Sequence, residues 1–410
     1  MILEFFTDPV LRAPTWGCIL MCIASSLMGV LILLKRQSLI SESLAHATYP
    51  GACLGIALFG FLFPGLQDWS FLAVLIGAFF SSLLGLKAIQ KMKNGPPDAA
   101  LTLVLSTFFG CGILIVSWLQ AVMPVCAKQT QMLLFGQAAT MSDIHIWIYG
   151  AFAMAVILFL LLTFRPLQAT LFDPQFAQTT RIPVAPLEKI LFWFLLVSLI
   201  IGIRSVGVVL MSGMAIAPAV AARQFSDRLQ TIFLLAALFG ALSAFLGNIG
   251  SVWLNLPTGP AIVIVGALFA FLSLLFAPLR GLLFRLYRIG AFRLRCVEEN
   301  LLKTLWKKRI LATHSWTCKI ALWRLQRAGW VDANRTLTDD GAKKAASIIR
   351  LHRLWELYLT EELGVQAEKV HRTAEEMEHI ITPEMEERLT RLLENPKHDP
   401  HHQPIPERER

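Results

Sequence analysis

Charged side chains are scarce in this 410-residue sequence, because only 16% of its residues are Asp, Glu, Lys or Arg. Soluble proteins contain roughly 25% charged residues. The deficit is matched by a hydrophobic content of 55%, which excludes an ordinary soluble protein for most of the chain. The composition therefore indicates an integral membrane protein.

Motifs for two kinds of chemistry are also missing. The seven cysteines include no CxxC pair, and most lie in apolar runs, where a thiol behaves as a small hydrophobic group. We therefore expect neither a thiolate zinc site nor a disulfide framework. No GxxxxGK(S/T) loop for nucleotide phosphates occurs. We therefore predict that the chain does not hydrolyse ATP itself and is not an enzyme.

The distribution of charge changes near residue 290. Residues 1–290 contain 16 Lys and Arg but 9 Asp and Glu, whereas residues 291–410 contain 21 and 19. The first part carries a net charge of +7 and is sparsely charged; the second carries +2 and is far more polar. We expect a membrane domain followed by a soluble one.

Nine apolar runs are candidates to cross a hydrocarbon core of ~30 Å. They lie near 15–34, 50–65, 70–90, 101–120, 143–164, 188–203, 206–222, 228–248 and 258–279. Of the 16 Lys and Arg residues up to residue 290, 13 fall in alternate loops, which the positive-inside rule assigns to the cytoplasm. The N-terminus is then outside, and the chain after Leu279 is inside.

One pair of ionisable residues lies between two apolar runs, in a part of the chain where charged side chains are rare. Glu42 and His46 are four residues apart in SLISESLAHATYPG, so on a helix they share one face. A carboxylate and an imidazole presented in this way form half of a site for Mn²⁺, Zn²⁺ or Fe²⁺. The alternative is a capping or interfacial pair that water solvates beside Lys35 and Arg36.

A larger candidate metal site lies near the C-terminus, on two predicted helices. Its residues are His352 and Glu356 on one helix, and His371, Glu375, Glu378 and His379 on the next. The spacing of the second group places all four side chains on one helical stripe. A solvated acidic helix with incidental histidines is the alternative interpretation.

A candidate DNA-binding segment precedes this site. The segment 317–327 is an amphipathic helix, followed by a hairpin-like turn and a new helix, which is the order of a winged helix-turn-helix. Its candidate DNA contacts are Thr317, Lys319, Arg324 and Arg327. An ordinary helical packing domain also contains such a helix, so both interpretations stay open at this point.

The membrane part resembles the manganese, zinc and iron permeases of ATP-binding-cassette (ABC) transporters. The resemblance is carried by GVLILLKRQSLISESLAHATYPG at 29–51, Asp98, LLFG at 133–136, LFDPQFA at 171–177, VGVVLMSGMAIAPAVAA at 206–222 and LPTG at 256–259. It implies that Glu42 and His46 bind the metal in the translocation path. This chain has Ser41–Glu42 where the family usually has Gly–Asp, so its metal preference stays open.

This resemblance also implies the partners and the location of the chain. Asp173, Pro174 and Ala177 match the loop that contacts the ATPase subunit. The other implied partners are a periplasmic metal-binding protein and a second permease subunit, identical or different. The location implied is the bacterial inner membrane.

Residues 296–406 resemble the iron- and manganese-dependent repressors of the diphtheria-toxin-repressor family. The resemblance implies that His352, Glu356, His371, Glu375, Glu378 and His379 are metal ligands, with Glu375 as in manganese-type members. Two further ligand positions are occupied here by Asn300 and Lys303, and the ten residues between Trp306 and Thr317 are few for the complete DNA-binding motif. The fusion resembles chlamydial metal-transport membrane proteins.

We predict an all-α polytopic membrane protein with about nine spans, followed by a cytoplasmic winged-helix-like and helical metal-binding domain. The domains are a permease (1–285), a basic linker (286–295), a winged helix-turn-helix-like segment (296–345), a metal-binding and dimerisation segment (346–394) and a flexible tail (395–410). The predicted function is import of a divalent transition metal with a fused repressor-like regulator. The alternatives are a membrane-tethered sensor and a cytoplasmic metal-binding gate that does not touch DNA.

Overall fold

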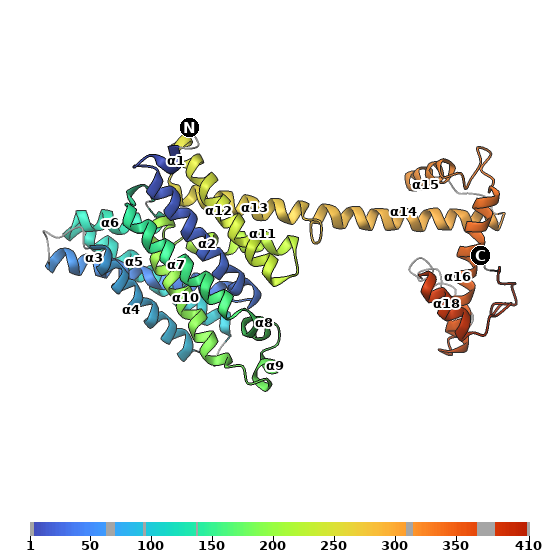
Figure 1. Cartoon of the computed structure of the whole chain (residues 1–410), viewed down its shortest axis with the longest axis horizontal. Coiled ribbons are helices and arrows are strands. Elements are labelled where there is room, and N and C mark those ends of the chain that lie inside the picture. The colour runs from blue at the N-terminus through green and yellow to red at the C-terminus, as the bar shows by residue number, and fades with distance from the viewer. Residues whose placement is uncertain are drawn as a thin grey trace. The chain divides into compact units, whose positions relative to one another are not determined.

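The computed structural model describes residues 4–62, 70–92, 96–136, 138–308, 315–366 and 382–407. Its long elements are helices, and the chain divides into two compact units, residues 1–284 and 285–410. In Figure 1 the first unit runs from blue to yellow and the second from orange to red.

The first unit contains, in its described residues, eight helices that are long and apolar enough to cross a membrane. They are α2 (Arg12–Leu34), α3 (Ser38–Leu62), α4 (Ser70–Lys91), α5 (Pro97–Val122), α7 (Asp143–Leu162), α10 (Val184–Val206), α12 (Leu229–Leu254) and α13 (Thr258–Phe276). The shorter elements are α1 (Glu4–Thr7), α6 (Pro124–Phe135), η2 (Ala138–Thr140), α8 (Phe164–Phe172) and α9 (Pro174–Thr179). The predicted polytopic all-α architecture is confirmed.

The expected span at 206–222 differs in detail from its prediction. It forms α11 (Met211–Phe225), whose 15 residues rise about 22 Å at 1.5 Å per residue. This is less than a hydrocarbon core of ~30 Å. The preceding helix ends because Gly207 takes a φ of +92°, a conformation that glycine adopts readily.

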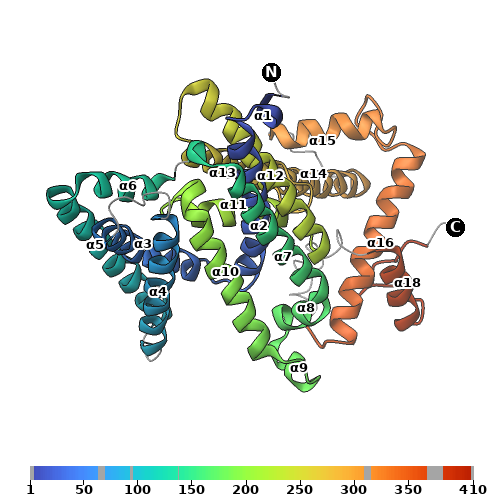
Figure 2. The same cartoon turned by 60° about the vertical axis from the view of Figure 1, so that its left-hand side comes forward.

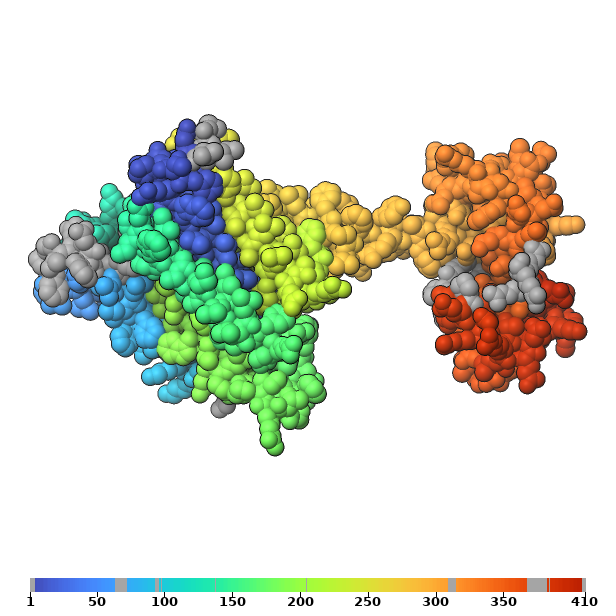
Figure 3. Space-filling view, viewed as in Figure 1, coloured from blue at the N-terminus to red at the C-terminus, as the bar shows by residue number. Residues whose placement is uncertain are grey.

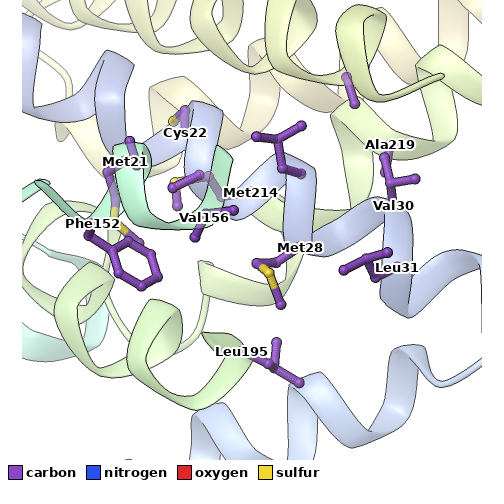
Figure 4. Packing of buried hydrophobic residues seen from close by; sticks show 14 of the residues in the cluster. Met21, Cys22, Met28, Val30, Leu31, Phe152, Val156, Leu195, Met214 and Ala219 are labelled. Atoms are coloured by element: carbon purple, nitrogen blue, oxygen red, sulfur yellow. The ribbon is translucent and has the colours of Figure 1, made fainter. Parts of the chain in front are cut away.

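Helix α2 is the central packing element of this unit. Sixteen of its 23 residues are buried, as expected for a helix that is apolar on all sides. Figure 4 shows Met21 and Met28 of α2 among Phe152 of α7, Leu195 of α10 and Met214 of α11. Three helices, α7, α10 and α11, thus pack against α2 in this view.

Helix α3 is held against α4 by direct contact between their backbones. A Cβ atom added to Gly77 would lie 2.1 Å from the carbonyl oxygen of Gly51, and one added to Gly55 would lie 2.2 Å from that of Ala73. Small residues allow such approach between membrane helices. The two helices lie side by side in Figures 1 and 2.

Three glycines from distant parts of the chain meet at the break between α10 and α11. Gly136 and Gly207 have φ angles of +73° and +92°, and a Cβ atom added to Gly259 would lie 2.4 Å from the oxygen of Phe135. The Val208 amide donates to the oxygen of Leu133 at 3.0 Å. The motifs LLFG, VGVV and LPTG are therefore parts of one contact, for which only glycine leaves space.

The second unit begins at residue 285, within α14 (Leu282–Trp306). Helix α15 (Trp316–Arg327), a turn that pairs Val331 with Leu337, and α16 (Asp339–Glu361) follow, and then α18 (Pro383–Leu392). Helix, turn and helix thus follow one another in the described residues, and the winged-helix-like character of this segment stays a prediction. A small core around Leu302, Leu325 and Ala345 joins α14, α15 and α16.

The segment after α18, expected to be a flexible tail, is held against α16 in its described part. Arg353 of α16 lies 3.4 Å from the carboxylate of Asp399, and Arg350 donates to the oxygen of Pro406 at 2.8 Å. Ile405 is only 7% exposed. In Figure 3 the residues from 382 onward (red) lie beside the orange part of the second unit. The buried Arg350 and the half-buried Arg353, which sequence composition did not single out, account for the difference.

We predict that replacing Gly77 by Ala lowers stability by about 1–3 kcal/mol, because the added methyl group overpacks the contact with Gly51. The matched control is Gly110→Ala, since nothing lies within 4 Å of a Cβ atom at that position. That change should be neutral or stabilise α5 by a few tenths to about 1 kcal/mol. Thermal unfolding of the detergent-solubilised protein measures both, and equal shifts would contradict the close contact.

Candidate functional site

Glu42 and His46 lie on successive turns of α3, near its N-terminal end. Glu42 is half-buried, and His46 is 8% exposed. The Nδ1 atom of His46 and the Oγ atom of Ser41 are buried without a hydrogen-bond partner among the described residues. Buried polar atoms are nearly always bonded, so two such exceptions beside one carboxylate mark a place where a ligand can supply the missing interactions.

An aromatic wall fixes the imidazole of His46. The ring of Phe109 on α5 meets it edge-on, with centroids 4.9 Å apart and planes at 75°. Tyr49, one turn further along α3, lies 6.0 Å from the same Phe109 ring. The His46 ring therefore has an apolar surrounding on this side.

The turns around the pair are anchored to both neighbouring helices. The hydroxyl of Ser43 donates to the oxygen of Leu101 in α5 at 2.9 Å. The hydroxyl of Ser81 in α4 donates to the oxygen of Ala47 at 2.7 Å. The pair therefore lies on a rigid part of α3, as a site that must hold its geometry requires.

The pair offers two possible metal ligands. Glu42 and His46 are of the types preferred by Mn²⁺, Zn²⁺ and Fe²⁺. No group of three or more His, Cys, Asp or Glu side chains that could hold a metal is found within the described ranges.

In the second unit, the structure describes two of the six predicted regulatory ligands. His352 and Glu356 are 6% and 2% exposed, and the His352 Nε2 atom lies 3.1 Å from Glu356 Oε1. Both line a cavity of about 500 Å³. The other four predicted ligands, His371, Glu375, Glu378 and His379, lie outside the described residues.

Arg350 is a residue whose importance the sequence analysis missed. It is 5% exposed, and its guanidinium bonds Glu386 Oε1 at 3.1 Å, Thr390 Oγ1 at 3.2 Å and the oxygen of Pro406. One side chain thus joins α16, α18 and the C-terminal segment. The sequence spacing indicates the burial of Arg350, because it lies four residues before Leu354 and both are on the buried face of α16.

The predicted ATPase-coupling residues form a short capped helix. The Asp173 carboxylate accepts from the Phe176 amide at 2.9 Å and caps α9, which Pro174 begins. Ala177 is fully buried, whereas the Phe172 and Phe176 side chains are 64% and 59% exposed. Exposed aromatic side chains are enriched at protein interfaces, so this segment offers a surface for a partner.

The four predicted DNA contacts all lie on exposed positions of α15. Lys319 lies 5.4 Å from the ring centroid of Trp316, and Arg327 lies 5.4 Å from that of Trp323. The side chain of Thr317 bonds Ser315 at 2.8 Å. A further contact joins Arg324 to Glu298 of α14 at 2.9 Å, so this guanidinium is partly neutralised within the unit.

Comparison with known protein families agrees with the two-part organisation. Residues 7–277 match the ABC 3 transport family. Residues 338–407 match the iron dependent repressor, metal binding and dimerisation domain.

Relatives match over one or both parts. A probable metal transport system membrane protein of Chlamydia trachomatis is 33% identical over 100% of this chain and 99% of its own. The manganese transport system membrane protein MntC of Bacillus subtilis is 30% identical over 85% of this chain and 83% of its own. The zinc transport system membrane protein TroC of Treponema pallidum is 32% identical over 70% of this chain and 95% of its own.

A solved structure supports the fold of the membrane part. PsaBC from Streptococcus pneumoniae in complex with Fab matches 68% of this chain and 96% of the solved chain, with 26% identity and a TM-score of 0.59. The match of fold, motifs and full length leads to one conclusion: the chain belongs to the ABC 3 transport family and carries a C-terminal domain similar to iron-dependent repressors.

Proposed function

We propose that this chain is the permease subunit of a bacterial ABC importer that moves Mn²⁺, Zn²⁺ or Fe²⁺ across the inner membrane. The observation that carries the proposal is the Glu42–His46 pair of α3, with a buried Nδ1 atom that lacks a hydrogen-bond partner among the described residues. Family membership and relatives named for manganese and zinc transport support a metal ion as the substrate.

The residues of this chain would act on the ion as ligands and walls. Glu42 replaces part of the hydration shell with a carboxylate, and His46 adds a neutral nitrogen ligand. Phe109 shields the pair from one side. Rigid-body motion of the permeases around such a central site would open it alternately to either side of the membrane.

Three partners belong to this proposal. A separate ATPase would dock on the α8–α9 segment around Asp173, Pro174 and Ala177, and a periplasmic protein would deliver the metal. A second permease, identical or different, would complete the path. The positive-inside pattern of 13 of 16 cations supports a cytoplasmic ATPase side and a cytoplasmic C-terminal domain.

We further propose that the second unit is a metal-responsive regulator that binds DNA through α15. The match of residues 338–407 to the repressor domain supports metal binding there. A tethered sensor without transport is disfavoured, because an anchor has no need of a whole permease. A cytoplasmic gate that binds metal without touching DNA is the second candidate, favoured by the contact of Arg324 with Glu298.

We predict that Glu42→Gln together with His46→Gln reduces metal uptake by about tenfold or more, because even outer-shell ligand partners are worth 10–100-fold in metal affinity. Uptake of radioactive Mn²⁺ and Zn²⁺ into cells that express the complete transporter is the measurement. Glu42→Asp, which restores the acid usual in the family, should retain transport. Unchanged uptake in the double variant, at equal membrane abundance, would refute the assigned path.

For the regulator, we predict that Lys319→Ala with Arg327→Ala weakens DNA binding and reduces the salt slope by about 2, since each lost phosphate contact reduces it by about 1. A soluble fragment covering residues 285–410 is titrated with DNA from its own promoter, with and without Mn²⁺ or Fe²⁺. Metal-dependent binding is expected. Absent or metal-independent binding would favour the gate.

A further inference from the structure

Lys303 is a buried lysine in α14. Its exposure is only 7%, and it follows the buried pair Leu301 and Leu302 in the helix. Lysine is almost never buried to this extent unless its ammonium group has a partner, and Lys303 takes part in an interaction in this structure. The position therefore carries a fixed positive charge inside the second unit.

This charge faces the cavity of about 500 Å³ that His352 and Glu356 also line. The other charged or polar lining residues are Lys307, Lys308, Arg353, Asp399, His401 and Gln403. The lining thus contains four Lys and Arg side chains but two carboxylates. A cavity with this balance is an unusual environment for a divalent cation.

Asp399 is already neutralised by its own neighbours. Its carboxylate lies 3.4 Å from Arg353 and accepts the amides of His401 and Gln403 at 2.9 and 2.7 Å. The remaining lining acid is Glu356, in contact with His352 at 3.1 Å. Lys307 and Lys308 are exposed, so water screens them; Lys303 is the buried ammonium on this side of the cavity.

We infer that Lys303 lowers the affinity of the His352–Glu356 site for divalent metal and thereby sets the metal concentration at which the second unit responds. An ammonium and a divalent ion repel each other strongly where water is excluded. Because both residues line the same cavity, this ammonium would also offset the charge of the buried Glu356 carboxylate when no metal is bound. This inference rests on the proposed regulatory role of the unit.

The test compares Mn²⁺ affinity in the full-length detergent-solubilised chain, in a Glu42→Ala and His46→Ala background that removes the candidate path ligands. Free Mn²⁺ is measured by electron paramagnetic resonance during titration, and the Mn²⁺-induced rise in unfolding temperature is the second readout. Lys303→Met keeps length and removes the charge. We expect this variant to bind Mn²⁺ at least about tenfold more tightly, which corresponds to a gain of about 1.4 kcal/mol in binding free energy.

Two variants control for charge and location. Lys303→Arg retains the positive charge, and Lys307→Met removes an exposed charge one turn further along the chain, so both should stay within about threefold of the unmodified affinity. If Lys303→Met does not fold without metal, Lys303→Gln takes its place with the same expectation.

Three results would overturn the inference: no gain in affinity without the Lys303 charge, an equal gain in Lys303→Arg, or no Mn²⁺ binding in any variant. The uptake assay of the Glu42 and His46 variants tests the transport proposal, and the Mn²⁺ titration tests the role of Lys303. Either result can fail without changing the other.

Discussion

The backbone contact of α3 with α4 is the constraint on which the position of the Glu42–His46 pair depends. Lipid tails are as apolar as leucine side chains, so membrane helices gain little by burying apolar surface against each other. Close packing has to supply the association. Gly51, Gly55 and Gly77 allow two backbones to touch, and this contact places the Glu42–His46 turns of α3 at a fixed position.

The buried hydroxyl groups show how the membrane unit satisfies its polar atoms. Ser25 and Ser26 of α2 donate to carbonyl oxygens of their own helix, while Ser43 and Ser81 bond between helices. Against this background the unpartnered atoms of Ser41 and His46 are exceptions. An exception has physical meaning here because an unsatisfied polar group in a buried place costs about 1–3 kcal/mol. A passing cation would remove that penalty at His46.

The second unit is organised by buried charges instead. Arg350 and Arg353 connect α16 to α18 and to the C-terminal segment, and Lys303 faces the cavity from α14. Such charges are costly to bury and remain only when they are bonded. In the proposed regulator their balance would decide how a metal site responds, so the second unit differs from the first in its physical basis as well as in its sequence.

The sequence alone determined the class of the protein, because a membrane imposes apolar runs of fixed length and because the permease and repressor motifs are local. It also predicted that Glu42 and His46 share one face of a helix, since a spacing of four residues on a helix is independent of the rest of the fold. It did not reveal that 206–222 contains a helix too short to span, that LLFG, VGVV and LPTG form one contact, or that the predicted tail is held by Arg350 and Arg353. Those features depend on which distant backbones approach each other and which buried charges find partners, and only the tertiary structure decides them.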